Sequence, residues 1–349
     1  MENIRIHQSS NGILIEHQNV KIIIDPNGSG SITNPDIILI SHAHTDHICG
    51  VTSLYKPGMK VIMSPETFRI LSLNGYKFLS NDLVLLKPGE QVSIKGVLIT
   101  ARNAGHIVGS LMYELDLGRI VVGYTGDFNF EDSIIMRGAD MIDADILLID
   151  STYGHPTFSF PPRKILYKII REKLKEAIDC GFIPSLHGYA LGKGQELTRL
   201  AWEFIGGKVS VDNSVGIYNK IFEDVAKKPL GNYIIGGLGD VLIRGFKRQK
   251  GEPPIIKRIF FTGWAVLSNK KTTGIPLSSH NSFTRLVDYI IRTQAERIIT
   301  VFNYESFFAE FIERELGIPA SPISQVPTDI SYKPKNLKRR RSFVLDFYF

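Results

Sequence analysis

Cysteine is scarce in this chain, with only Cys49 and Cys180 among 349 residues. Two thiols do not make a disulfide framework, so we expect a reducing, cytoplasmic location. The sequence has no run of eighteen apolar residues, so no transmembrane helix and no membrane partner are expected. Residues 1–6 lack a basic segment followed by an apolar stretch, so no signal peptide is expected there either. A composition of 43% hydrophobic and 22% charged residues indicates an ordinary globular protein.

The net charge of +6 is local rather than spread along the chain. Residues 333–341 hold six basic residues, and without them 35 basic residues balance 35 acidic ones. A uniformly basic surface is therefore no argument that the body of the protein binds nucleic acid, although a local basic tract can contact phosphates.

The first third of the chain is rich in short runs of isoleucine and valine bounded by Asn, Gly and Pro, a pattern typical of β-strands. The runs that we interpret as strands are Ile13–Ile15, Val20–Ile24, Ile37–Ile40, Val61–Met63, Val92–Ile99, Leu111–Leu115, Ile120–Tyr124 and Ile146–Ile149. From Pro162 to Cys180 the apolar residues recur at helical spacing instead. Strands and helices then alternate, which predicts a parallel sheet in a separate, inserted α/β domain.

The segment Ser41–His47 follows a buried strand and holds three imidazoles and one carboxylate. His42 and His44 alternate in extended backbone and so project to the same side, while Asp46 and His47 begin a turn. Imidazole nitrogen and carboxylate oxygen are the ligands that zinc and similar divalent ions prefer. The alternative, a polar surface loop, is weak because five of the nine histidines fall in the proposed site.

Two later residues are expected to join this cluster. His106 lies in a loop after a strand that ends near Thr100, and Asp127 ends another strand in the sequence Thr-Gly-Asp. Loops at one edge of a sheet can bring both residues to the first segment. A carboxylate such as Asp127 can bridge two metal ions, which polarise a phosphoryl oxygen and activate water.

In this order the motifs resemble the metallo-β-lactamase superfamily, whose His-x-His-x-Asp-His signature matches residues 42–47. More narrowly, the chain resembles the β-CASP nucleases over roughly residues 10–305. The stretches that carry this narrower resemblance are Asp150–Gly154, Ala190–Leu197 and Ser278–Phe283. The resemblance implies an α/β fold, a metallo-β-lactamase αββα sandwich with an inserted α/β β-CASP cap domain. It assigns the sandwich to residues 1–160 and 256–320, the cap to 161–255, and a basic, aromatic tail to 321–349.

The resemblance also assigns the site. The first metal ion would be held by His42, His44, His106 and Asp127. The second would be held by Asp46, His47 and Asp127, with His280 as a further candidate. Asp150 would orient ligands or water, and His280 would alternatively give a proton to the leaving oxygen. Asp46, Asp150 and His280 are therefore the candidate catalytic residues. Two zinc ions are the expected cofactors, with Mn²⁺ or Mg²⁺ as alternatives at the second site.

The implied reaction is hydrolysis of phosphodiester bonds in nucleic acid by metal-activated water. Many RNA-processing members carry a further histidine in a His-Gly-Glu stretch, where this chain has Phe302 and Asn303. The DNA-processing branch, the Artemis and cross-link-repair nucleases, lacks that histidine too, and it resembles the chain at Thr262–Trp264 and His280–Phe283. The Ser-Thr-Tyr-Gly and Gly-x-x-Gln-Glu-Leu stretches are more similar to the RNA branch.

We interpret the chain as a 5′ to 3′ DNA exonuclease of repair that acts on single-stranded DNA. An RNA endo- or exonuclease of the 3′-end-processing type is the alternative. Two alternatives of other classes are a small-molecule metallo-hydrolase and a non-catalytic scaffold that binds nucleic acid.

The cap would form one wall of a cleft, and the metal edge would form the other. The candidates for phosphate contacts are Lys164, Lys193, Lys270 and Lys271. The candidates for base stacking are Tyr189, Phe261 and Trp264. Each of these, taken singly, is more often a solvated lysine or a core aromatic.

Residues 341–349 contain an aliphatic residue followed shortly by two aromatics. This pattern resembles a peptide that binds the sliding clamp (PCNA), although the usual glutamine is absent. Docking of the aromatics on the chain's own body is an equal alternative.

Overall fold

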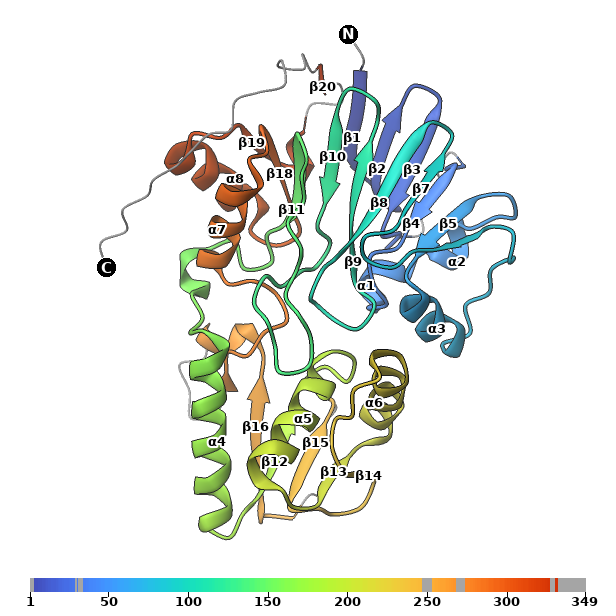
Figure 1. The fold of residues 1–349 in the computed structure, drawn as a ribbon. Coiled ribbons are helices and arrows are strands. Elements are labelled where there is room, and N and C mark those ends of the chain that lie inside the picture. Colours follow the sequence, from blue (N-terminus) through green and yellow to red (C-terminus); the bar gives the residue numbers. More distant parts are fainter. Residues whose placement is uncertain are drawn as a thin grey trace.

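The computed structural model describes residues 3–28, 30, 34–246, 253–267, 274–326 and 330–331, and the strands of this part form three sheets (Figure 1). The first sheet has the strand order β20-β1-β2-β3-β4-β5-β6. Its strands are β1 (Asn3–Ser9), β2 (Gly12–His17), β3 (Val20–Ile24), β4 (Ile37–Leu39), β5 (Lys60–Met63), β6 (Leu83–Leu85) and β20 (Ile330–Ser331). The helices that follow its strands are α1 (Thr45–Ile48), α2 (Val51–Leu54) and α3 (Pro65–Leu73).

The second sheet has the strand order β19-β18-β11-β10-β9-β8-β7. Its strands are β7 (Gln91–Ile94), β8 (Val97–Asn103), β9 (Leu111–Asp116), β10 (Val121–Tyr124), β11 (Ile146–Asp150), β18 (Arg297–Val301) and β19 (Ala320–Pro322). The helices that accompany it are α7 (Phe283–Thr293) and α8 (Glu305–Phe311). Helix α8 continues into a π-helical segment, Ile312–Leu316. Short 3₁₀ turns lie at Pro156–Phe158, Gly263–Leu267 and Ile323–Gln325.

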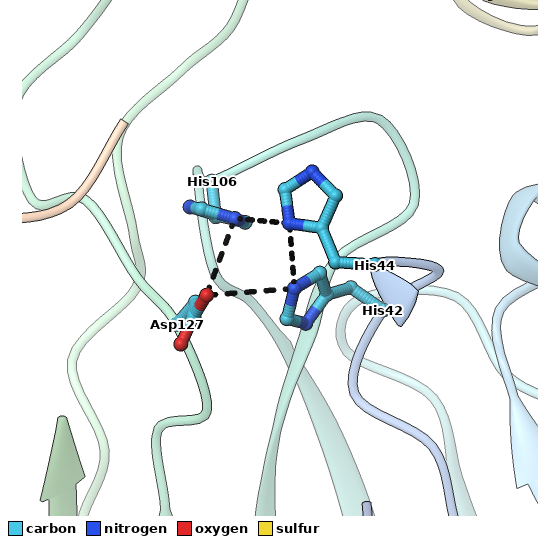
Figure 2. A group of neighbouring side chains, drawn as sticks. All are labelled: His42, His44, His106 and Asp127. Carbon is cyan, nitrogen blue, oxygen red and sulfur yellow. Dashed lines mark hydrogen bonds and ion pairs between the residues drawn. The ribbon is translucent and has the colours of Figure 1, made fainter. Parts of the chain in front are cut away.

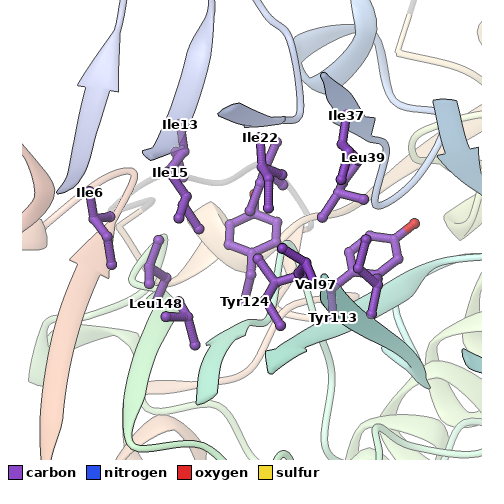
Figure 3. Close-up of a cluster of buried hydrophobic side chains, with 14 of the residues drawn as sticks. Ile6, Ile13, Ile15, Ile22, Ile37, Leu39, Val97, Tyr113, Tyr124 and Leu148 are labelled. Atoms are coloured by element: carbon purple, nitrogen blue, oxygen red, sulfur yellow. The ribbon is translucent and has the colours of Figure 1, made fainter. Parts of the chain in front are cut away.

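These two sheets pack face to face over an apolar core (Figure 3). Ile15, Ile22 and Leu39 of the first sheet are fully buried and belong to one cluster with Tyr113 and Leu148 of the second. Burial of each such side chain stabilises the fold by about 1.5–3 kcal/mol. Helices α1, α2 and α3 bury apolar residues against the outer face of the first sheet, and α7 and α8 do so against the second. The predicted αββα sandwich is therefore confirmed.

One predicted strand is wrong in detail. The run Val92–Ile99 is not continuous but forms a hairpin, in which β7 pairs antiparallel with β8. The two residues between these strands, Lys95 and Gly96, both have positive φ, at 51° and 82°. A two-residue turn with positive φ at both positions matches the twist of paired strands, so the chain reverses there.

The third sheet forms the cap, in the strand order β14-β13-β15-β12-β16-β17, and neighbouring strands in it run parallel (Figure 1). Its strands are β12 (Ile183–His187), β13 (Val209–Val211), β14 (Tyr233–Ile235), β15 (Val241–Arg244), β16 (Ile256–Phe261) and β17 (Gly274–Ile275). Its helices are α4 (Arg163–Asp179), α5 (Lys193–Ile205) and α6 (Asn213–Ala226). Leu166, Ile170 and Leu174 recur every four residues on α4 and are buried in the cap core, which confirms the predicted helix.

The cap extends beyond its predicted end at residue 255. Strand β16 pairs with β12, with Ile256 opposite Ile183, and β17 continues the same sheet. Strands β16 and β17 thus belong to the cap sheet and not to the returning part of the sandwich. Local sequence identifies a strand but does not say which sheet it joins, because pairing is decided by distant partners.

A buried ionic cluster joins the cap to the sandwich. The Arg163 guanidinium donates from Nε to Glu196 Oε1 at 3.0 Å and from Nη2 to the carbonyl oxygen of Ser278 at 2.6 Å. Lys193 Nζ and the Tyr167 hydroxyl also donate to the Glu196 carboxylate, each at 2.6 Å. Burial alone would raise the pKa of Glu196, but the charges of Arg163 and Lys193 outweigh it and lower that pKa to about 2. Lys193 is therefore an internal ion-pair partner rather than the predicted phosphate contact.

None of the helices in the described ranges has the length and apolar character that crossing a bilayer requires.

Breaking the buried cluster should destabilise the protein strongly. We expect Arg163→Met to lower the free energy of unfolding by about 3–5 kcal/mol, because Glu196 loses its main cationic partner inside the protein. The matched control is Arg137→Met, which removes an exposed ion pair with Asp140 and should stay within about 1 kcal/mol of wild type. Urea unfolding measures both variants, and equal free energies of unfolding would show that the buried cluster contributes no more than the surface pair.

Candidate metal centre

The loops that carry the candidate ligands leave the sandwich at the edge that faces the cap (Figure 1). Strands β3 and β4 are parallel, as are β10 and β11, so the carboxyl ends within each pair meet at the same edge. His42 and His47 follow β4, Asp127 follows β10, Asp150 ends β11, and His106 lies between β8 and β9. His280 comes from the segment between β17 and α7. Residues far apart in sequence are thereby gathered at one point.

Figure 2 shows the first cluster, formed by His42, His44, His106 and Asp127. His44 Nδ1 lies 3.0 Å from His42 Nε2 and 3.1 Å from His106 Nε2. Both Nε2 atoms lie 3.5 Å from Asp127 Oδ2. The four candidate ligand atoms lie within 4.8 Å of one another, and three of the four residues are buried. Three imidazole nitrogens and one carboxylate oxygen form a complete zinc ligand set.

The other nitrogen of each of these rings is held by a hydrogen bond that fixes the tautomer. His44 Nε2 donates to the carbonyl oxygen of Leu191 at 3.3 Å, and His106 Nδ1 donates to that of Ser279 at 2.9 Å. The Ser41 hydroxyl donates to Asp25, so it accepts from His42 Nδ1, which lies 2.9 Å away. A carbonyl only accepts, so the facing nitrogen carries the proton. The lone pairs that remain all point into the cluster.

Burial favours the neutral, metal-binding form of these imidazoles. It lowers the pKa of His42 and of His106 well below the ordinary value of histidine, and it lowers that of His44 as well. Metal binding requires neutral imidazole, so these rings need to lose no proton at neutral pH. The donor chemistry of the first cluster therefore fits a divalent ion such as zinc.

A second cluster shares Asp127 with the first and adds His47, His280 and Asp150. His47 Nε2 lies 3.4 Å from Asp127 Oδ1, and His280 Nε2 lies 3.6 Å from Asp127 Oδ2. Their Nδ1 atoms are held by carboxylates, His47 by Asp25 at 2.8 Å and His280 by Asp150 at 2.9 Å. Burial disfavours the charged form of His47, but Asp127 and Asp25 outweigh it and raise its pKa well above the ordinary value.

Asp46, the remaining predicted ligand, lies in neither cluster. It is exposed in the first turn of α1, and within the described ranges no hydrogen bond or ion pair is found at its carboxylate. The stretch expected to hold a further histidine, near Asn303, has none, and the ring of the preceding Phe302 lies with its centroid 5.3 Å from that of His47. Phe302 has a φ of 74°, a backbone angle that residues other than glycine rarely adopt. Within the described residues, neither Asp46 nor a further histidine adds to the second cluster, which consists of Asp127, His47, His280 and Asp150.

Sequence reasoning missed Asp25, which lies beneath the ligands at the end of β3. Its buried carboxylate accepts hydrogen bonds from the Ser41 amide and hydroxyl, at 2.7 and 2.6 Å. It also accepts from the Tyr124 hydroxyl at 2.7 Å and from His47 Nδ1 at 2.8 Å. The sequence did contain a signal for this residue, because Asp25 is a single acidic residue directly after the apolar run Ile22–Ile24. Asp127 and Asp150 also stand at the ends of strands.

The predicted nucleic-acid contacts have mixed outcomes. Phe261 is wrong as a stacking residue, because it is 1% exposed and packs in the cap core. Lys164 and Tyr189 are exposed, and Trp264 is 36% exposed, so all three are accessible. Lys270, Lys271 and the proposed clamp-binding segment 341–349 lie outside the described residues.

Comparison with known proteins identifies the class. Residues 22–168 match the family described as "Beta-lactamase superfamily domain". Together with the sandwich, this match shows that the chain carries a β-lactamase superfamily domain, and the relatives that it matches include proteins named as RNases.

Three relatives illustrate the range of similarity. An RNase aCSPSF2 of Saccharolobus solfataricus is 28% identical over 47% of this chain and 38% of its own length. An RNase J-like protein of Methanocaldococcus jannaschii is 29% identical over 49% of this chain and 44% of its own. A protein named "Probable DNA ligase" of Opitutus terrae is 26% identical over 82% of this chain and 28% of its own. In each case the match spans less than half of the relative.

The hydrogen bond from His47 to Asp25 should support metal affinity. We expect Asp25→Asn to weaken binding of the second divalent ion about 10–100-fold, because the ring loses the carboxylate that orients it. Asp36→Asn is the matched control, since Asp36 lies at the opposite end of β4, where it accepts from the Lys21 amide. Zinc titration of chelator-treated protein measures both, and an unchanged affinity in Asp25→Asn would contradict the assignment.

Proposed function

We propose that this protein is a metal-dependent nuclease that hydrolyses phosphodiester bonds. The observation that carries the proposal is the convergence of five imidazole rings around one buried carboxylate, Asp127, at the edge beneath the cap. Two divalent ions bound there, most simply zinc, would polarise a phosphoryl oxygen and lower the pKa of water. Two clusters that share Asp127 fit such a pair, with Mn²⁺ or Mg²⁺ as the alternative at the second.

His280 has a distinct place in this proposal. Its side chain is 21% exposed, more than those of His42, His47 and His106, and the Asp150 carboxylate orients it. Burial lowers its pKa, but Asp127 and Asp150 outweigh that effect and raise the pKa to about 9. The two carboxylates thus favour the protonated, acidic form of the ring. We assign it the donation of a proton to the leaving oxygen, with Asp150 as the group that holds the ring in place.

For the substrate we propose single-stranded DNA, digested from 5′ to 3′ in repair. The similarity to the relative named as a probable DNA ligase extends over 82% of this chain, whereas the two RNases match 47% and 49%. The absence of a histidine near Asn303 agrees with the DNA-processing branch. RNA is the second candidate, because relatives named as endoribonucleases match 62–65% of the chain.

End-labelled single-stranded DNA and RNA of matched sequence test both candidates. We expect cleavage of DNA that requires a divalent metal, is lost in Asp127→Asn and is retained in Asp224→Asn, a control on the exposed surface of α6. Product lengths over time give the direction of digestion. Preferential cleavage of RNA would favour the second candidate. No cleavage of either polymer by protein shown to hold its metals would overturn the proposal in favour of a small-molecule hydrolase or a scaffold.

The role of His280 has its own test. We expect His280→Ala to lower kcat about 100- to 10,000-fold while the metal content stays unchanged. Because the acid must be protonated, wild-type activity should fall as the pH rises through the pKa of His280, and the variant should lose that alkaline limb. Loss of one metal equivalent in His280→Ala would instead show that the residue is a ligand.

A further inference from the structure

Two aromatic side chains of the cap lie in the open beside the metal centre. Tyr189 is 60% exposed and Phe246 is 39% exposed. Their ring centroids are 4.9 Å apart at an interplanar angle of 87°, so the edge of one ring meets the face of the other. The Tyr189 ring centroid is also 6.3 Å from that of His44, a candidate ligand of the first cluster. We call Tyr189 and Phe246 the aromatic pair.

The backbone that carries Tyr189 is held tightly although its side chain is exposed. Its carbonyl oxygen accepts from the Gly194 amide at 2.8 Å, at the start of α5. The Gln195 side chain spans the same turn, donating to the Ala190 carbonyl at 3.0 Å and accepting from the Gly192 amide at 2.7 Å. The next carbonyl, that of Leu191, accepts from His44. The ring thus projects from an ordered turn, and the hydrogen bond from His44 to Leu191 fixes the position of that turn relative to the metal centre.

Core packing does not account for this ring. Isolated exposed aromatics are common on protein surfaces and need no explanation. Tyr189 differs because it is paired with a second exposed ring, sits on a fixed backbone and lies next to a candidate metal ligand. Phe182 directly precedes β12, at the end of that strand opposite Tyr189. It is 40% exposed, close to the value for Phe246, and serves as the comparison.

We propose that the aromatic pair is a stacking platform for a nucleobase, namely the base of the nucleotide whose phosphate reaches the metal centre. This inference rests on the proposed nuclease function and deepens it. Bases present a flat π-face whatever their identity, so stacking on Tyr189 tolerates sequence while fixing the nucleotide. A base inside a duplex is already stacked on both sides. The platform therefore selects single strands or frayed ends.

The first test compares three variants of the full-length, metal-loaded protein on a single-stranded oligonucleotide. We expect Tyr189→Ala to raise KM about 5- to 100-fold, the range for loss of one base stack, with a smaller change in kcat. Tyr189→Phe should recover most of the affinity, because the ring remains. Phe182→Ala should behave as wild type. Equal KM values for Tyr189→Ala and Phe182→Ala would overturn the inference.

The second test removes the base instead of the ring. Oligonucleotides with one abasic residue, moved along the strand, should bind wild-type protein more weakly at a single position relative to the cleaved bond. The same substitution should cost no further affinity in Tyr189→Ala, because ring and base act as one unit. Fluorescence anisotropy with metal-loaded protein and strands whose linkages resist hydrolysis measures binding separately from cleavage. Additive losses would contradict stacking, whereas failure of wild type to cleave any strand would instead count against the nuclease proposal.

Discussion

The direction of the imidazole lone pairs is the constraint on which the site depends. Five histidines each have one nitrogen occupied by a hydrogen bond, and the free nitrogen then faces Asp127 or its neighbours. The acceptors come from all parts of the fold: carboxylates from the ends of β3 and β11, a serine beside β4, and carbonyls from the cap turn and the segment before α7. Ring nitrogens and a carboxylate gathered in a buried site favour positive charge between them, whether as protons or as metal ions.

The cap takes part in this arrangement through two separate contacts. The Leu191 carbonyl fixes the proton of His44, and Arg163 holds the Ser278 carbonyl, one residue before the Ser279 carbonyl that accepts from His106. A buried ion pair is a weak source of net stability but is costly to break, so it favours one arrangement over others. The ionic cluster around Glu196 accordingly serves to position the chain: it holds segment 278–280 where the Ser279 carbonyl can accept from His106.

The clustering of the candidate ligands was predictable from sequence because their residue types and spacing are rare. Three histidines within six residues, with His106, Asp127 and His280 following in order, left few alternatives. The orienting groups were not predictable, since the Leu191 and Ser279 carbonyls have no side-chain signature and Asp25 is one acid among 35. The extent of the cap and the burial of Phe261 depend on strand pairing and register, which are set by contacts distant in sequence.

The hydrogen bond between His44 and the Leu191 carbonyl makes the sandwich and the cap depend on each other. Gly192 follows Leu191 with a φ of 91°, and a Cβ there would meet Ile107 Cγ2 at 2.5 Å. The turn thus packs closely against the loop that carries His106, and a larger residue at position 192 would clash with that loop. A ligand of the sandwich has its tautomer set by the inserted domain. If related proteins exchanged their caps, this turn and the sandwich surface that it contacts would therefore have to be exchanged together.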